Sequence, residues 1–377
     1  SEPISRANVI VFCNGRIKVL KMTDFYETEM NYQTYETEIK AITAEEKLTS
    51  AIMFVADPNP PKVAILTCQQ SDLVAASVSQ LPTILENNGY IVDTVDPLTQ
   101  DIDSDYSAVI LAAPYTDLTE TVTGKLTTYL ENGGEYGKNL IYFANFDQRD
   151  TPTLDAFLEE WGIKVGKGYV DNENKAELLQ LGLAALQQYV VVPQAKLTAG
   201  NETLVKSADL PIAMPYSRPL ELTFTEGDGR ETETILKTSS TSVVKALAEN
   251  AGQNGSDQNT VETVAEGEQN VLVRGSKHRF VGEEKISSNV YAFGSAFFID
   301  YYITSIDALN NQELAIGIIN NSTGKGEGIT ILSKSLVVDT INISEKAVRT
   351  VVFLVQIALP LAIAAAGVIV YLRRRNK

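Results

Sequence analysis

The sequence predicts an α/β protein with a mostly parallel sheet and one membrane-spanning helix at its C-terminal end. Two observations predict this class. Apolar strand-like and helix-like runs alternate between residues 62 and 165, as in consecutive βαβ units. The final apolar run, residues 351–372, is long enough to cross a bilayer. The chain of 377 residues has room for two or three modules.

The first expected module spans residues 1–56 and combines a β-hairpin with a helix. Runs 9–13 and 16–20 are joined by Asn-Gly, which tolerates the positive φ angles of a tight turn. Residues 43–46 match a capping box, and an apolar stripe follows at helical spacing. The proline cluster at 57–61 then marks a module boundary.

The second expected module, residues 57–170, carries the α/β alternation. Strands are expected at 63–67, 90–95, 107–113, 139–144 and 163–165, and helices at 73–88, 118–132 and 153–161. Apolar strands that alternate with helices favour a sheet covered on both faces. We therefore predict a flavodoxin-like, doubly wound parallel sheet.

The third expected module, residues 171–345, is β-rich and completes the ectodomain. Strands are expected at 189–192, 220–224, 271–273, 290–293 and 329–332, with helices at 242–249 and 312–320. Residues 250–270 hold few large apolar side chains and bury little surface, so they predict a mobile loop.

The last module, residues 346–377, predicts a membrane anchor. No charged side chain lies between Val351 and Leu372, and Pro360 within this span predicts a kink. A buried soluble helix is the alternative, but such a helix usually has a polar face. The basic tip that follows consists of Arg373, Arg374, Arg375 and Lys377.

The positive-inside bias places this basic tip in the cytoplasm and the ectodomain outside the cell membrane. Export of such an ectodomain requires an upstream signal, yet the chain opens with Ser-Glu-Pro-Ile. We therefore expect that an upstream signal or first transmembrane helix is missing.

Composition narrows the function. A formal net charge of −17 argues against nucleic-acid binding. The two cysteines, Cys13 and Cys68, are far apart and predict neither a disulfide nor a zinc site. The single histidine, His278, leaves one possible histidine base, and its polar neighbours favour a solvated hairpin tip. No metal or other cofactor is expected.

Five motifs in a fixed order carry a family resemblance. They are EKLTSAI at 46–52, KVAILT at 62–67, YLENGG at 129–134, TLDAFLEEWGI at 153–163 and FGS at 293–295. With the C-terminal span, they resemble the gliding-motility-type auxiliary components of ABC transporters. These bacterial membrane proteins contain an extracytoplasmic flavodoxin-like or amidotransferase-like domain.

The resemblance implies partners, namely ABC permease and ATPase subunits, for a non-catalytic subunit in the membrane. The chain has no Gly-x-x-x-x-Gly-Lys-Ser/Thr loop and would not hydrolyse ATP itself. Family members often have a Gly-His-Gly-Glu-like turn after the first α/β strand, where this chain has Cys-Gln-Gln-Ser at 68–71. No role of that histidine is carried over.

The candidate binding site lies where the strand order of a doubly wound sheet reverses, at the carboxyl ends of the strands. For the order 2-1-3-4 this crevice lies between 68–72 and 114–117. The candidate ligand- or partner-binding residues are Cys68, Gln69, Gln70, Asp72, Pro114, Tyr115, Asp117, Asn145 and Asp147.

Other functions stay open. Cys68 as a nucleophile would make the chain a cysteine-dependent hydrolase or amidotransferase-like enzyme, although no activating base is visible. A surface attachment protein is a further alternative. The aspartates between 93 and 105 invite a calcium site, but they lack the Gly turn and final Glu of an EF-hand, so a charged surface loop is favoured.

Overall fold

The computed structural model describes residues 8–13, 15–31, 36–246, 262–306, 308–325, 334–335, 360 and 375. Its contacts divide the chain into two units. One comprises Ser1–Phe25 and Thr43–Ser333, and the other comprises Tyr26–Ile42 and Lys334–Lys377. The boundaries of these two units differ from those of the expected modules. The units group residues that contact one another, whereas the expected modules are consecutive stretches of the chain.

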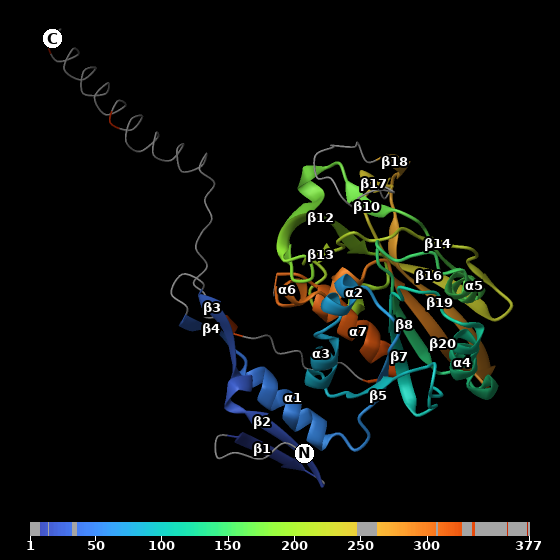
Figure 1. Ribbon diagram of the computed structural model, residues 1–377, viewed down its shortest axis with the longest axis horizontal. Coiled ribbons are helices and arrows are strands. Elements are labelled where there is room, and N and C mark those ends of the chain that lie inside the picture. The colour runs from blue at the N-terminus through green and yellow to red at the C-terminus, as the bar shows by residue number, and fades with distance from the viewer. Residues whose placement is uncertain are drawn as a thin grey trace. The chain divides into compact units, whose positions relative to one another are not determined.

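A mixed sheet of 13 strands, counted over the described residues, forms the centre of the first unit (Figure 1). Its main path has the order β11-β12-β16-β19-β20-β8-β7-β5-β6. The parallel strands are β5 (Lys62–Leu66), β6 (Ile91–Val95), β7 (Tyr106–Ala112), β8 (Asn139–Phe143) and β20 (Glu284–Phe293). The expected order 2-1-3-4 is found in β6-β5-β7-β8, and the α/β class is confirmed.

The other strands of the path are antiparallel and lie in the segment expected to be β-rich. They are β11 (Leu178–Leu183), β12 (Gln188–Leu197), β16 (Arg230–Lys237) and β19 (Asn270–Val281). Short strands beside them are β9 (Ile163–Val165), β13 (Ile212–Ala213), β14 (Leu220–Leu222) and β15 (Glu226–Gly227). The strand expected at 163–165 in the parallel sheet instead pairs antiparallel with residues 220–222, so that part of the prediction is wrong. The β-rich segment thus continues the α/β sheet, because β20 pairs with β8.

A smaller sheet of three strands corrects two predictions. It consists of β10 (Tyr169–Asn172), β17 (Ser242–Lys245) and β18 (Thr263–Glu266). The predicted helix 242–249 is wrong at its start, since β-branched Val243 and Val244 lie in β17. The predicted loop 250–270 contains β18. Its side chains are exposed, and the strand is stabilised by backbone pairing with β17. Residues 250–261 lie outside the described residues.

Helices cover both faces of the parallel strands (Figure 1). On one face lie α2 (Asp72–Ser77), α3 (Leu81–Asn87) and α7 (Asn311–Thr323), and on the other lie α4 (Glu120–Glu131) and α5 (Pro152–Glu160). The single helix expected at 73–88 is wrong. Pro82 has no N–H to donate to Val78, so the helix breaks between Ser77 and Leu81.

The predicted N-terminal hairpin is confirmed as β1 (Asn8–Cys13) and β2 (Arg16–Lys21), with Gly15 at φ +82°. The turn η1 (Met22–Phe25) and helix α1 (Ala44–Ala56) belong to the same unit. The prediction that residues 43–46 form a capping box is wrong. The Thr43 hydroxyl donates to the Asp24 carbonyl at 2.7 Å and makes no cap bond, because the end of η1 lies beside it.

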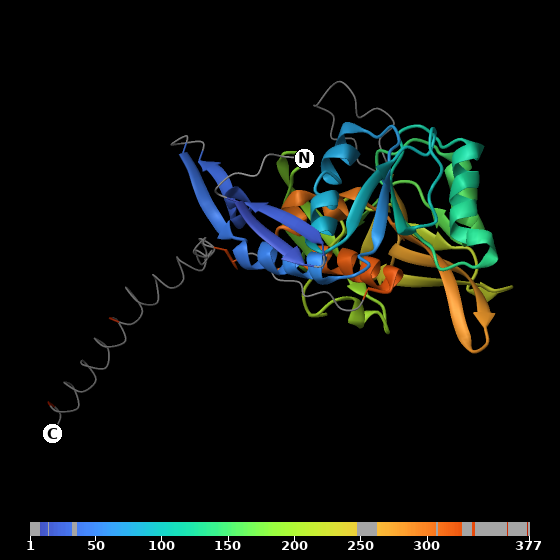
Figure 2. The same cartoon turned by 90° about the horizontal axis from the view of Figure 1, so that it is seen from below.

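Short helical segments complete the first unit. They are η2 (Asn132–Gly134), η3 (Lys175–Glu177), η4 (Glu202–Leu204), η5 (Ala296–Ile299) and α6 (Tyr301–Thr304). Figure 2 shows the β19–β20 hairpin, in orange, reaching the rim of this unit. Phe280 and Val281 at its turn are exposed.

The second unit contains an antiparallel sheet of β3 (Tyr26–Asn31), β4 (Glu36–Ile42) and β21 (Lys334–Ser335). The strand expected at 329–332 lies outside the described residues, as do Val351, Leu372, Arg373, Arg374 and Lys377. Pro360 and Arg375 are described singly, each with helical backbone. Within the described part of the chain, no helix has both the length and the apolarity needed to cross a membrane.

Candidate functional site

The loops after β5 and β7 meet at the predicted crevice. The Tyr115 N–H donates to the Gln69 carbonyl at 2.6 Å. The Cys68 thiol lies 3.4 Å from the Ala112 carbonyl. The two strands are neighbours in the sheet, so their carboxyl ends lie side by side and these bonds tie the loops together. The structure therefore brings the loops at 68–72 and 114–117 together, as expected, and their role in binding stays a prediction.

Cys68 is poorly suited to act as a nucleophile. Burial raises the pKa of its thiol to about 11, and a hydrogen bond with Gln70 lowers that pKa only in part. At neutral pH the thiolate, which is the reactive form, is therefore rare. The thiol hydrogen bond to Ala112 leads to no base.

His278 does not supply that base. It lies within β19, opposite Ser287 of β20, and three strands separate β19 from β5 in the sheet. The expectation of a solvated hairpin tip is wrong for this side chain, which is half-buried with its Nδ1 atom buried and unpartnered. The hairpin continues three residues beyond it, so the turn lies farther out.

Asp117 has a structural task that the sequence reasoning missed. Its carboxylate accepts hydrogen bonds from the Thr153 N–H at 2.8 Å and the Leu154 N–H at 3.2 Å. Thr151, the residue before α5, makes no side-chain cap bond. Asp117 therefore caps α5 from a distant part of the chain and complements the positive end of the helix dipole.

Arg149 is the functional candidate that the sequence did not single out. Its guanidinium lies 4.1 Å from the centre of the Tyr115 ring and also donates to the Tyr115 hydroxyl. Arg149 is exposed, whereas Tyr115 is half-buried. No local sequence signal pairs these two residues, since their contact depends on the adjacency of β7 and β8. The pair offers a cation and an aromatic face to a partner.

The remaining predicted residues complete a polar edge. Asn145 is fully buried; its amide donates to Asp147 at 2.5 Å and its Oδ1 atom has no partner. Asp72 is exposed in the first turn of α2, where the Ser71 hydroxyl accepts from the Val74 N–H. Buried Pro114 and exposed Gln69 lie in the tied loops.

The carboxyl end of β20 is covered. Gly294, directly after β20, lies under the segment 214–219, where a Cβ atom would be only 2.4 Å from the Arg218 carbonyl oxygen. The Arg218 N–H donates to the Gly294 carbonyl at 2.8 Å, and its Nε donates to Gly166 at 2.7 Å. The segment 214–219 thus closes the carboxyl end of β20.

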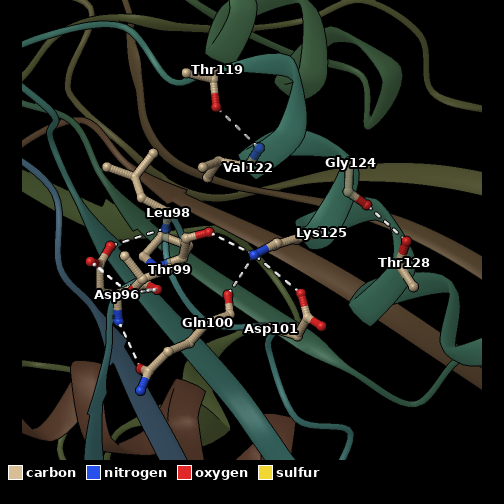
Figure 3. Close-up of polar contacts among 11 residues, drawn as sticks. Asp96, Leu98, Thr99, Gln100, Asp101, Thr119, Val122, Gly124, Lys125 and Thr128 are labelled. Atoms are coloured by element: carbon tan, nitrogen blue, oxygen red, sulfur yellow. Dashed lines mark hydrogen bonds and ion pairs between the residues drawn. The ribbon is translucent and has the colours of Figure 1, made fainter.

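A loop takes the place of a helix after β6. The Lys125 ammonium of α4 donates to the Pro97 carbonyl at 3.0 Å and the Gln100 carbonyl at 2.7 Å, and pairs with Asp101 at 3.1 Å (Figure 3). Asp96 accepts from the Leu98 N–H at 3.0 Å in the same loop (Figure 3). Lys125 thereby satisfies backbone groups that a helix would have paired internally.

The other aspartates of this acidic stretch also have protein partners. Asp93 accepts from the Tyr106 hydroxyl, Asp103 from the Asp105 N–H, and Asp105 pairs with Lys62. No group of three or more metal-binding side chains exists among the residues that the structure describes. These contacts favour the surface-loop interpretation over a calcium site.

Two cavities lie away from the predicted crevice. One, of about 560 Å³, lies between residues 203–206 and α7. The other, of about 450 Å³, lies between α4 and α5. None of the nine predicted binding residues lines either cavity. The exposed and half-buried candidates therefore form a polar surface beside a thiol whose pKa is raised by burial, whereas Pro114 and Asn145 are buried.

A scan of the chain against protein-family models finds no match, and a search of curated proteins finds no match either.

Proposed function

We propose that this chain is a membrane-anchored, extracytoplasmic auxiliary subunit of an ABC-type transport system. In this role it binds a partner or ligand at the carboxyl edge of a flavodoxin-like domain and catalyses no reaction. The strand order β6-β5-β7-β8-β20 supports the flavodoxin-like assignment, because it equals the order 2-1-3-4-5 of that fold. The positions of α2, α3 and α7 opposite α4 and α5 support it as well.

One observation carries the non-catalytic part of the proposal. At the edge where doubly wound sheets hold their ligands, the only cysteine of the predicted set has a thiol whose pKa is raised by burial, and its hydrogen bonds go to Ala112 and Gln70 rather than to a base. Beside it, Arg149 stacked on Tyr115 forms a surface suited to recognition. Binding without chemistry is the function that this arrangement supports best.

The anchoring part rests on sequence. The uncharged run 351–372 and the basic residues after it favour a single span with the ectodomain outside. Permease and ATPase partners are inferred from the family resemblance.

Co-purification tests the partner assignment. The full chain, crosslinked mildly in membranes, should recover a permease and an ATPase. If the partner contacts the carboxyl edge of the sheet, Arg149→Glu should reduce that recovery, because it replaces the cation over the Tyr115 ring with an anion. Lys196→Glu, an exposed charge reversal on β12, is the matched control and should leave recovery unchanged. Recovery of the chain alone would count against the proposal.

Protease protection tests the orientation. Protease added to intact cells should degrade the ectodomain and spare the basic tip. A spared ectodomain with a clipped tip would reverse the topology and remove the proposed role.

A further inference from the structure

A groove separates the two helices that cover the second face of the parallel strands. Its volume is about 450 Å³. Gly124, Ala156 and the buried ring of Phe157 contribute apolar lining, and Glu120 and Glu160 contribute carboxylates. All of these residues belong to α4 or α5 of the first unit. The rest of the lining is Thr123, Thr127, Pro152 and Thr153, so the groove combines apolar surface and hydroxyl groups with negative charge.

Gly124 keeps this groove open at a cost. It lies inside α4, where glycine is less favourable than alanine. A Cβ atom at this position would have nothing within 4 Å, and the φ angle is not positive. No described contact of the chain thus requires glycine here. We infer that the open space serves a group from outside the chain.

The charges of the groove favour a cationic occupant. Glu120 is exposed and forms no ion pair within the described part of the chain. Glu160 is 63% exposed and lies 3.9 Å from the Lys277 ammonium. Neither helix has a basic residue in its last turn, although both end in glutamate, where the helix dipole disfavours negative charge. The Lys277 ammonium offsets this effect only weakly, because the pair is long and Glu160 is largely exposed, so a second cation beside Glu160 would offset it further.

The nearest cation on α4 is engaged elsewhere. Lys125 directs its ammonium to the loop at 97–101 and not to the groove (Figure 3). The negative charge of the groove is therefore not cancelled by its own helix.

We propose that this groove binds an amphipathic helix of a partner protein that carries two Lys or Arg residues about seven positions apart. Because α4 and α5 follow the neighbouring parallel strands β7 and β8, they run in the same direction, so Glu120 at the start of α4 and Glu160 at the end of α5 lie toward opposite ends of the groove. The lining of α4 from Glu120 to Thr127 is seven residues long, about 10.5 Å, which matches two cations seven positions apart on a partner helix. An apolar side chain midway between the two cations fills the space over Gly124 and Ala156. This pattern is that of helix-in-groove recognition. The proposal does not depend on the transport role.

Titration with a designed peptide tests it. The probe is an Ala-rich helix of about 16 residues, long enough to be helical, with two lysines about seven positions apart and a leucine midway. Calorimetry on the full chain should show saturable binding. Trp161 is the only tryptophan of the chain and follows Glu160, and its ring centre lies 4.7 Å from the Lys277 ammonium. Binding should therefore also change its fluorescence.

Two variants locate the binding. Gly124→Leu fills the groove and should raise Kd at least about tenfold. Thr121→Leu adds the same side chain to an exposed position of α4 that does not line the groove, and should leave Kd within about twofold. Glu120→Gln combined with Glu160→Gln should weaken binding several-fold and remove most of its salt dependence. Melting curves report whether each variant is folded.

Three results would overturn the proposal: no saturable binding up to millimolar peptide, equal binding of a peptide with glutamates in place of the lysines, or an unchanged Kd in folded Gly124→Leu.

Discussion

At the scale of single residues, Cys68 shows how tertiary burial decides reactivity. The sequence places a thiol where a nucleophile would serve, at the end of the first α/β strand. Burial then raises the pKa of that thiol to about 11 and keeps it protonated. Folding favours the protonated thiol. Its contribution to stability is therefore complete below pH about 9, the ordinary pKa of the thiol, and is lost as pH rises toward 11.

Alkylation kinetics test this directly. In a Cys13→Ser variant, iodoacetamide should label Cys68 of the folded chain at about pH 8 roughly two orders of magnitude more slowly than in the denatured chain. Mass spectrometry measures both rates, and the folded rate should climb toward pH 11. Fast labelling of the folded chain near pH 7 would contradict the assignment and revive the enzyme hypothesis.

Two glycines predict opposite effects of the same substitution. At Gly275 a Cβ atom would lie 2.0 Å from the Trp161 carbonyl oxygen, so Gly275→Ala should lower the free energy of unfolding by about 1–3 kcal/mol. At Gly124 the space is open and the backbone is helical, so Gly124→Ala should raise it by about 0.5–1 kcal/mol. Urea denaturation measures both changes. A change of the same sign in the free energy of unfolding for both variants would contradict the two local geometries.

At the scale of elements, side chains from distant parts of the chain satisfy backbone groups that local capping residues would otherwise satisfy. The carboxylate of Asp117 caps α5, and the ammonium of Lys125 holds the loop after β6. The first contact joins segments that follow the adjacent parallel strands β7 and β8. The second joins segments that follow β7 and β6, which β5 separates in the sheet. The local capping box at residue 43 fails because the hydroxyl of Thr43 bonds to the Asp24 carbonyl instead.

Removing the Lys125 ammonium should loosen one loop. Lys125→Met keeps much of the apolar stem but leaves the Pro97 and Gln100 carbonyls without their donor, so we expect a loss of about 1–3 kcal/mol. Amide exchange should quicken at residues 97–101. Lys164→Met breaks an exposed pair with Glu221 and should cost about 0–1 kcal/mol. Similar losses in both variants would contradict the proposed hold on the loop.

At the scale of the whole molecule, the parallel and antiparallel halves form one sheet. β20 lies beside β8, although 140 residues separate Phe143 from Glu284 in the chain. Phe143 and Phe293 stack at 4.6 Å across this boundary. The helix that follows β20, α7, covers the same face as α2 and α3. The α/β segment is therefore completed only by the end of the β-rich segment.

A fragment of residues 57–170 should consequently not fold. Without β20 and α7, the buried strand β8 gains an open edge and one face of the sheet loses its cover. Circular dichroism should show no cooperative melting, whereas residues 57–325 should melt in one transition. A sharp transition of the short fragment would show that the α/β segment is independent.

The sequence by itself determined the element types wherever periodicity and turn chemistry agree. Asn-Gly at residues 14–15 specified the hairpin, and the buried apolar runs of β5, β7 and β8 specified parallel strands. These signals are local, and in these elements the tertiary contacts agree with them. The helix break near Pro82 was also readable from sequence, because proline removes a donor wherever it occurs.

Tertiary structure alone decided how the β-rich segment joins the sheet, which charges are paired and which thiol is inert. Residues 242–245 became a strand because β10 and β18 offered backbone partners. The Arg149–Tyr115 pair and the cap by Asp117 exist because β7 and β8 are adjacent. Pairing partners distant in sequence leave no local pattern, so these features depend on the fold.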